Sequence, residues 1–333
     1  MAGATAAPSG FLVIDKSAGI TSFDVIRELR RTLGIRKLGH SGVLDKPATG
    51  VLVIGANRAT RLFELFGGFE KEYTAHVWLG LATATDDLAG ELLSALGPGR
   101  LARERVEEAL GAFHGEIMQQ PPAFSLAKKD GRELYRYALA GVEVEVEPKR
   151  VAVHELALTS FNPEQDVRDE LPADSKLAHL ELPLLACVGI ELSCSGGLYV
   201  RSLARDLGGA LGVGGTLGRL VRTRVGPFTL AQAVPLEGMA EAAARQGGAS
   251  GVLMPLSTIA PEEARLYLDK TQLEFVRHGR SIRRFKHLLP PSAQQRGDLV
   301  YAVAPDGELA AVLSVASVDP HGLVELRPSL VLG

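Results

Sequence analysis

A loop-like segment near the N-terminus carries the residues best suited to chemistry. Residues 39–50 read GHSGVLDKPATG, with three glycines, a histidine at position 40 and an aspartate at position 45. Glycine lets the backbone approach a bound molecule closely. We therefore expect a loop that presents the carboxylate of Asp45 to a ligand. An aspartate that only caps a turn is the simpler alternative.

Other groups of residues lack the spacing that ligand binding requires. The glycine-rich stretch 208–218 matches neither the dinucleotide fingerprint nor the P-loop, which favours a helix end followed by a tight loop. The eight histidines are scattered, without ligand spacing to cysteine, aspartate or glutamate, so no metal site is predicted. Cys187 and Cys194 are seven residues apart on a strand-like segment. They should point to opposite faces and be buried as small apolar residues.

Basic side chains cluster in two stretches of a slightly acidic chain. The formal net charge is −3, yet residues 27–40 and 277–287 are rich in arginine and lysine. Acidic residues concentrate at 143–147 and 164–174. This distribution predicts locally positive surfaces that could meet nucleic acid. Solvated charged faces without a partner are the common alternative.

The composition is that of a folded globular protein. The chain has 333 residues, 46% apolar and 23% charged, enough for one large domain or two ordinary ones. No uncharged apolar stretch approaches the roughly 18–20 residues of a membrane helix. Residues 1–10 lack the features of a signal peptide and are expected to form a disordered tail. Two cysteines cannot form a disulfide framework, which favours a reducing, cytoplasmic setting.

Apolar periodicity predicts the elements that would position these residues. A capping-box-like start at Thr21 and a glycine at position 34 bracket a helix with apolar residues from 25 to 33. Further helices are expected at 58–66, 101–113 and 200–211. Strands are expected at 11–14, 50–55, 73–79, 142–147, 151–158 and 186–194.

Strands and helices mix without strict alternation, which favours an α+β fold with a mixed or antiparallel sheet. The stretch GGASG at 247–251 resembles a linker, and short strands follow it at 299–304, 309–315 and 324–326. We therefore expect a disordered tail at 1–10, a main domain at 11–250 and a small β-rich domain at 251–333.

Five sequence blocks, in order over residues 11–230, resemble the bacterial TruB family of tRNA pseudouridine synthases. The blocks lie at 16–22, 39–50, 71–90, 119–128 and 194–208. They correspond to the family patterns KPxGxTS, GHxGTLDPxATG, KxY with LGxxTxTxDxxG, QxPPx[FY]SAxK, and CSxGTYIRxLxxDLG. The chain departs from these patterns at Ser17, Val43, Lys46-Pro47, Gly196 and Leu198.

The resemblance implies an enzyme that isomerises uridine 55 in the TΨC arm of tRNA. It implies a pseudouridine synthase domain, followed by a PUA-like RNA-binding domain, and a cytoplasmic protein. The reaction needs no cofactor, and we expect a monomer. Asp45 would be the catalytic carboxylate, whether it attacks the sugar, attacks the base or removes the C2′ proton. Arg201 would pair with it as a permanent cation.

The family pattern also implies a pocket for a flipped-out uridine. Tyr73 would stack on the base, Tyr199 and Leu220 would line the pocket, Asp87 would recognise the polar edge of the uracil, and His40 would fill or brace the vacated space. Ordinary structural roles are the alternatives: a strand residue at Tyr73, a core leucine at Leu220 and a turn former at Asp87.

Two other functions remain open at the level of sequence. A non-catalytic tRNA-binding or tRNA-folding module is suggested by the substitutions beside Asp45 and Tyr199, and it predicts RNA binding that does not depend on Asp45. An unrelated small-molecule enzyme is suggested only by the net negative charge. That function predicts no salt-sensitive affinity for RNA, whereas phosphate contacts make RNA binding fall steeply with salt.

Overall fold

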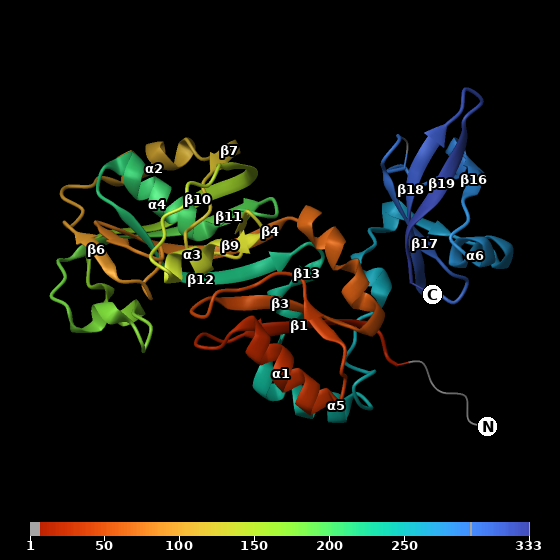
Figure 1. Cartoon of the computed structure of the whole chain (residues 1–333), viewed down its shortest axis with the longest axis horizontal. Coiled ribbons are helices and arrows are strands. Elements are labelled where there is room, and N and C mark those ends of the chain that lie inside the picture. The colour runs from red at the N-terminus through yellow and green to blue at the C-terminus, as the bar shows by residue number, and fades with distance from the viewer. Residues whose placement is uncertain (1–6, 294, 333) are drawn as a thin grey trace.

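A ten-stranded mixed sheet organises most of the chain in the computed structural model, which describes residues 7–293 and 295–332. The strand order is β14-β1-β3-β12-β4-β11-β10-β7, with β2 beside β3 and β13 beside β12. Figure 1 shows this sheet on the left. The β1–β14 and β3–β12 pairs are parallel and the other pairs are antiparallel. The strands are β1 (Gly10–Lys16), β2 (Leu38–His40), β3 (Thr49–Ala56), β4 (Lys71–Leu79), β7 (Gly115–Gln119), β10 (Lys149–Gln165), β11 (Leu185–Cys194), β12 (Gly215–Val225), β13 (Phe228–Thr229) and β14 (Val234–Pro235).

Helices cover one face of this sheet. The α-helices of the chain are α1 (Ser22–Leu33), α2 (Arg103–Gly111), α3 (Leu134–Leu139), α4 (Val200–Leu211), α5 (Met239–Arg245) and α6 (Lys270–Arg277). Side chains of α1, α2 and α4 share one buried core with β1, β3, β4 and β11. The predicted start and end of α1 are confirmed, because Thr21 and Asp24 form a capping box and Gly34 adopts a left-handed conformation. None of the helices described is long and apolar enough to cross a membrane.

Two smaller cores lie on the opposite face of the sheet. One joins β1, β3 and the 3₁₀ helix η1 (Asn57–Gly68) to C-terminal residues such as Leu256 and Leu332. The segment expected as a helix at 58–66 is thus helical, but with 3₁₀ geometry. The other core surrounds Trp78 and Cys187, whereas Cys194 belongs to the helix-side core. The two cysteines therefore occupy opposite faces of β11, as their odd spacing indicates.

A five-stranded sheet follows at the C-terminus, drawn in blue on the right of Figure 1. Its order is β15-β17-β18-β19-β16. Before this sheet the chain turns back, and Phe11 and Met254 exchange two backbone hydrogen bonds of 2.9 and 2.8 Å. The sheet itself begins at residue 265. Its strands are β15 (Arg265–Tyr267), β16 (Ile282–Phe285), β17 (Leu299–Val303), β18 (Leu309–Val318) and β19 (Leu323–Val331).

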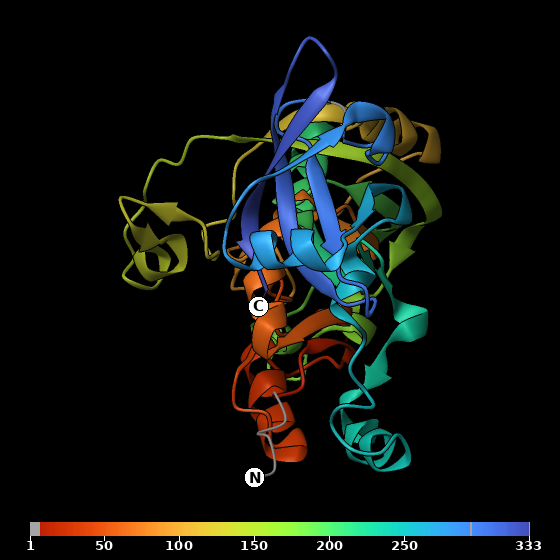
Figure 2. The same cartoon turned by 90° about the vertical axis from the view of Figure 1, so that its right-hand side faces the viewer.

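The strand expected at 142–147 is wrong. Residues 142–148 are irregular, and within the described residues no strand pairs with them. The alternation of valine and glutamate there is real, but Val142 is exposed and Val144 and Val146 are only half-buried. A strand needs hydrogen-bonding partners as well as alternation, and this segment ends a long excursion between β7 and β10. The excursion carries α3 and a short ribbon, β8 (Lys128–Lys129) and β9 (Arg132–Glu133), and extends from the body at the left of Figure 2.

A second short ribbon, β5 (Leu81–Thr83) with β6 (Leu92–Ala95), follows β4. Of the expected disordered tail, residues 1–6 lie outside the described residues, and β1 begins at Gly10.

Candidate active site

The loop between β2 and β3 holds Asp45 at the mouth of a cavity. Leu44, the preceding residue, is buried and anchors the loop, because its backbone N–H donates to the Ser22 hydroxyl (3.0 Å) and its carbonyl accepts from the same hydroxyl (3.2 Å). The backbone N–H of Ala48 donates to the carbonyl of Asp45 at 3.1 Å and closes a tight turn. The Asp45 side chain itself remains 40% exposed. The loop is therefore fixed while its carboxylate stays accessible.

Lys16, at the end of β1, braces the same loop from inside the protein. Its ammonium donates to the carbonyls of Ser17 (3.0 Å), Ile20 (2.9 Å) and Lys46 (3.3 Å). The pKa of Lys16 is lowered to about 8, because the effect of burial outweighs the opposing charge of Asp45, and the charge of Arg222 adds a smaller lowering. The ammonium thus ties the turn before α1 to the loop that carries Asp45.

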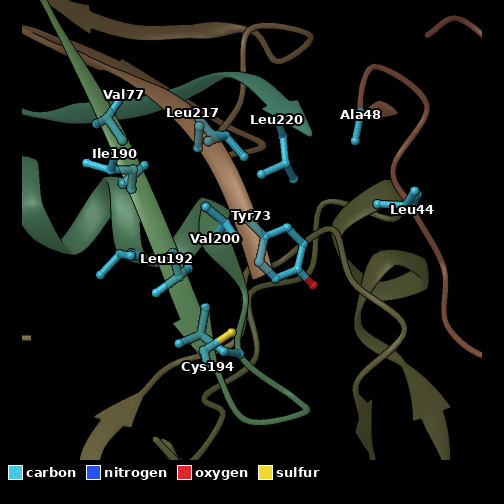
Figure 3. Close-up of a cluster of buried hydrophobic side chains, with 14 of the residues drawn as sticks. Leu44, Ala48, Tyr73, Val77, Ile190, Leu192, Cys194, Val200, Leu217 and Leu220 are labelled. Atoms are coloured by element: carbon cyan, nitrogen blue, oxygen red, sulfur yellow. The ribbon is translucent and has the colours of Figure 1, made fainter. Parts of the chain in front are cut away.

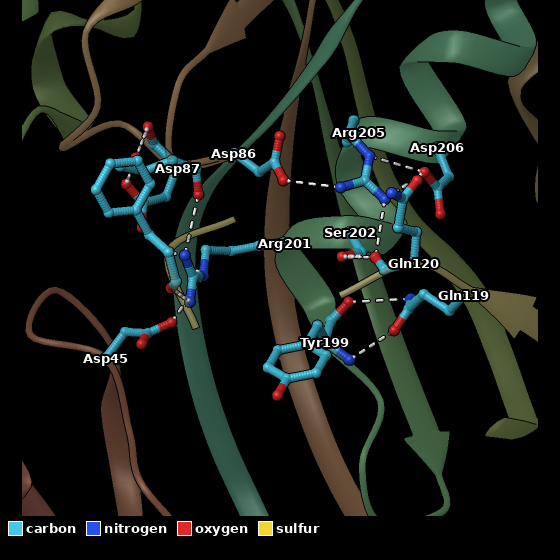
Figure 4. Close-up of polar contacts among 12 residues, drawn as sticks. Asp45, Asp86, Asp87, Gln119, Gln120, Tyr199, Arg201, Ser202, Arg205 and Asp206 are labelled. Carbon is cyan, nitrogen blue, oxygen red and sulfur yellow. Dashed lines mark hydrogen bonds and ion pairs between the residues drawn. The ribbon is translucent and has the colours of Figure 1, made fainter. Parts of the chain in front are cut away.

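Arg201 joins three segments around the carboxylate (Figure 4). Its Nε lies 2.9 Å from Oδ2 of Asp45, and its two terminal nitrogens each donate at 3.0 Å to the carbonyls of Thr85 and Phe124. The side chain is only 7% exposed and lies in the first turn of α4. Because its donors are shared among three different partners, the guanidinium has a fixed orientation. The single contact through Nε leaves the second oxygen of Asp45 free of this arginine.

Tyr73 belongs to a row of paired residues that runs across four strands of the sheet. In this row Tyr73 of β4 faces Leu192 of β11 and Arg222 of β12, and Arg222 faces Gly50 of β3. Gly50 has φ of 96°, and a Cβ there would lie 2.3 Å from the carbonyl of Arg222, so only glycine fits. Figure 3 shows the ring beside Val200 and the leucines of β12. Burial raises the pKa of Tyr73, so its hydroxyl is neutral.

The cavity beside these residues has a volume of about 570 Å³. Four of the seven predicted site residues line it: Asp45, Tyr73, Tyr199 and Arg201. Tyr199 is held by Gln119, whose side chain accepts from its backbone N–H at 2.8 Å and donates to its carbonyl at 3.1 Å. The remaining lining residues are Ser41, Gly42, Val43, Phe66, Gly67, Lys71, Phe124, Ser125, Leu126, Tyr135, Gly196, Gly197 and Arg222.

Asp87 lies behind Arg201 and does not line the cavity. Its Oδ1 accepts from the Thr85 hydroxyl at 2.5 Å and from the backbone N–H of Ala89 at 3.0 Å, and its Oδ2 is 3.9 Å from Nε of Arg201. Burial raises the pKa of Asp87, and the hydrogen bond from Thr85 and the charge of Arg201 oppose that shift. Its contact with a uracil stays a prediction, whereas its contacts in the structure shape the Thr85 turn.

His40 and Leu220 likewise do not line the cavity. His40 ends β2, and its buried Nδ1 has no hydrogen-bond partner within the described part of the chain. Burial and the charge of Arg222 lower the pKa of His40, which favours a neutral ring. Leu220 is buried in the same core as Tyr73 (Figure 3). The roles predicted for these two residues therefore stay predictions.

Arg222 and Lys16 are the site residues that sequence reasoning missed. Arg222 is 3% exposed, donates from Nε to the carbonyl of Val51 at 2.8 Å, and points its terminal nitrogens at the carbonyls of Val43 (3.4 Å) and Gly42 (3.3 Å). Lys16 is the first residue of the sequence block at 16–22, so the motif itself indicates this position. Arg222 follows an ordinary strand pattern, so only strand pairing places it beside the Asp45 loop.

Comparisons with known proteins agree with this architecture. Residues 30–200 match the model of the TruB family pseudouridylate synthase N-terminal domain, and residues 201–264 match that of the tRNA pseudouridylate synthase B C-terminal domain. The chain is 38% identical over 323 residues to the tRNA pseudouridine synthase B of Arthrobacter sp. (strain FB24), covering 96% of this chain and 97% of the relative. It is 43% identical over 234 residues to the protein of that name from Mycobacterium leprae, covering 70% and 68%.

Among solved structures, a chain of a Cbf5-Nop10-Gar1 complex has the same fold. The TM-score is 0.68 at 21% identity, covering 97% of this chain and 85% of the other. That match spans both the ten-stranded and the five-stranded sheet and confirms the expected α+β class. Because the matched family models, the near-full-length relatives and the fold agree, the chain belongs to the TruB family of pseudouridylate synthases.

Proposed function

We propose that this protein isomerises uridine 55 in the T arm of tRNA to pseudouridine, with Asp45 as the catalytic carboxylate. The observation that carries the proposal is the Asp45–Arg201 pair at 2.9 Å on the rim of a cavity walled by Tyr73 and Tyr199. The sequence relatives named tRNA pseudouridine synthase B support the choice of tRNA as substrate.

The cavity fits a single flipped-out nucleotide. Its volume of about 570 Å³ falls within the range of small-molecule sites, roughly 300–1,000 Å³. A base taken out of its stack loses a few kcal/mol, and stacking on an aromatic ring returns about 1–3 kcal/mol. We assign that stacking role to Tyr73, with Tyr199 on the adjoining wall. Leu220 and His40 support this wall from behind.

The chemistry needs one carboxylate and no external group. The N1–C1′ glycosidic bond breaks, the uracil turns within the cavity, and C5 forms the new bond to C1′. The hydrogen on C5 leaves as a proton and N1 takes up a proton, so the product is an isomer of the substrate. Asp45 starts this sequence, and its exposed oxygen faces the incoming nucleotide. Arg201 balances the charge of the carboxylate and holds its orientation. Asp87 acts as a positioning residue through Arg201 and the Thr85 turn. We propose that no cofactor takes part.

Basic surfaces outside the cavity would hold the RNA backbone. Such contacts position a nucleic acid without reading its sequence. On α1, Arg27 and Arg31 are paired with acids of the same helix, whereas Arg36 and Lys37 after it are exposed. Around α6 and β16, the exposed side chains of Arg277, Arg280, Arg283 and Lys286 form a second basic cluster. We assign that cluster, and the PUA-like domain at 251–333, to tRNA binding by a cytoplasmic monomer.

The test is tritium release from tRNA labelled at C5 of uridine. Wild type should release about one equivalent of tritium per tRNA, because the single isomerisation expels one C5 hydrogen. Asp45→Asn should release none while still binding tRNA. The matched control is Asp306→Asn, which removes an exposed carboxylate in the turn between β17 and β18, outside the cavity, and should leave release intact.

Two results would contradict the proposal. A folded Asp45→Asn protein that still releases tritium would remove Asp45 from the catalytic role. Wild type that binds tRNA without any release would instead establish a non-catalytic binding module.

A further inference from the structure

The sheet face opposite the candidate active site carries a small core of its own. Trp78 of β4 and Cys187 of β11 pack there against the segment 166–184, which contributes Val167 and Leu177. Two 3₁₀ helices lie in this segment, η2 (Val167–Glu170) and η3 (Lys176–His179). The acidic stretch with no assigned role in sequence analysis is therefore a cover for one patch of the sheet.

Three potential metal ligands converge at the edge of this core. In the β4–β11 register His76 faces Gly189 and Trp78 faces Cys187. Paired residues share a face and alternate residues do too, so His76 and Cys187 project from the same face of adjoining strands. Glu170, at the end of η2, reaches the two strands from the covering segment. The imidazole nitrogens, the sulfur and a carboxylate oxygen supply atoms that all lie within 4.8 Å of one another.

The Glu170 carboxylate is already held in one orientation by its contacts. One carboxylate oxygen is in contact with Nδ1 of His76. The other accepts from Nε1 of Trp78 at 2.9 Å and from the backbone N–H of Arg219 at 3.3 Å. Hydrogen bonds of this kind to a ligating carboxylate fix its direction in known metal sites. Two ligands on paired strands and a third fixed by a tryptophan form a preorganised set.

We propose that His76, Glu170 and Cys187 form a binding site for one divalent cation of the zinc class. Nitrogen, oxygen and sulfur donors together suit Zn²⁺, whereas magnesium and calcium prefer oxygen alone. Zinc binds such ligands at about 2.0–2.3 Å, so tetrahedral ligand atoms lie about 3.3–3.7 Å apart. The ligand atoms lie up to 4.8 Å apart, so side-chain rotation has to bring the farthest of them roughly 1 Å closer. The contacting atoms of His76 and Glu170 have to separate to admit the ion. The imidazole is 36% exposed, which leaves the fourth position to water.

Binding exchanges protons for the cation. Coordination breaks the S–H bond of Cys187 and replaces any proton held between His76 and Glu170, and the protons released pass to solvent. Carboxylate and thiolate then balance both charges of the ion. No oxidation or reduction takes place.

An occupied site would fasten the segment that contacts the Asp45 loop. Beyond Glu170, Asp174 forms an ion pair with Lys46 at 2.6 Å, and the hydroxyl of Ser175 donates to the carbonyl of Leu88 at 2.6 Å. The cation would thus link the outer face of the sheet to two loops, the one that carries Asp45 and the one that carries Asp87. The proposal itself concerns metal binding and stands independently of the proposed reaction.

The test titrates the metal-stripped full chain with Co²⁺ and follows the sulfur-to-cobalt charge-transfer absorption. Wild type should show this absorption, saturating at about one Co²⁺ per chain, and Zn²⁺ should remove it by displacement. Cys187→Ser should abolish it. The matched control is Cys194→Ser, which alters a buried cysteine of the same strand on the opposite face and should leave the absorption unchanged.

A second variant covers the case in which Cys187→Ser fails to fold. His76→Gln changes a part-exposed side chain and should weaken Co²⁺ binding at least about tenfold. Absence of the charge-transfer absorption in wild type would overturn the proposal and leave the cluster as a hydrogen-bonded anchor. Equal titrations for wild type and His76→Gln would overturn it as well.

Discussion

At the scale of single residues, three buried cationic side chains contact the Asp45 loop. Arg201 contacts the carboxylate itself, Lys16 donates to the carbonyl of Lys46, and Arg222 points at the carbonyls of Val43 and Gly42. A buried ammonium costs stability unless its hydrogen bonds compensate for lost hydration. Lys16 makes three such bonds, yet burial still lowers its pKa from 10.5 to about 8.

This shift predicts a pH dependence of stability that belongs to Lys16. Between pH 8 and 10.5, the unfolded chain binds more protons at this residue than the folded chain does, so the free energy of unfolding rises with pH. The gain is at most about 1.4 kcal/mol per pH unit. Urea unfolding of wild type and Lys16→Met measures it, and the difference between the two proteins should shift in favour of wild type across this window. Parallel pH profiles would contradict the assignment.

At the scale of elements, two neighbouring residues at the start of α1 have different structural roles. Thr21 caps the helix by accepting from the backbone N–H of Asp24 at 3.1 Å. Ser22, the next residue, exchanges two hydrogen bonds with the backbone of Leu44 and thereby fastens the Asp45 loop to the helix. Substituting Thr21 and Ser22 one at a time therefore distinguishes the effect on helix stability from the effect on the position of the loop.

We predict that Ser22→Ala lowers both stability and turnover. The loss of two buried hydrogen bonds costs about 1–3 kcal/mol, and the shifted loop should slow pseudouridine formation on the order of 10- to 100-fold. Thr21→Ala should cost about 1 kcal/mol through the lost cap, with turnover close to wild type. Unfolding curves and tritium-release rates for both variants measure this. Equal turnover in the two variants would show that Leu44 needs no anchor.

At the scale of the whole molecule, the two sheets share a core. Phe11 of β1 and Leu309 of β18 belong to the same buried cluster, and Arg58 donates to the carbonyl of Leu332 at 2.9 Å. The five-stranded sheet has a second core of its own around Leu326. The two parts should therefore stabilise each other, and the basic cluster near α6 keeps a defined position relative to the cavity.

Leucine substitutions in the two cores test this coupling. Each of Leu309→Ala and Leu326→Ala should cost about 2–5 kcal/mol. Only Leu309→Ala should also speed amide hydrogen exchange in β1, because its side chain supports both sheets. Hydrogen exchange measured strand by strand distinguishes the two variants. Faster exchange of β1 in Leu326→Ala to the same extent would indicate global unfolding rather than a shared core.

Local sequence determined the features that depend on short-range chemistry. The cap at Thr21, the stop at Gly34 and the Asp45 loop between two strands all follow from residue types at close spacing. The ordered motifs also identified Asp45, Tyr73, Tyr199 and Arg201, which line one cavity. The failed strand at 142–147 marks the limit, because the alternation of residue types along a segment carries no information about a pairing partner.

Only the tertiary structure decided which distant residues meet. Arg222 reaches the Asp45 loop through the row that joins β3, β12 and β4, and Asp87 stands behind Arg201 rather than in the cavity. His76, Glu170 and Cys187 are far apart in sequence, so residue spacing along the chain does not indicate the proposed metal site. Strand register and burial are properties of long-range pairing, and a single sequence read locally does not specify them.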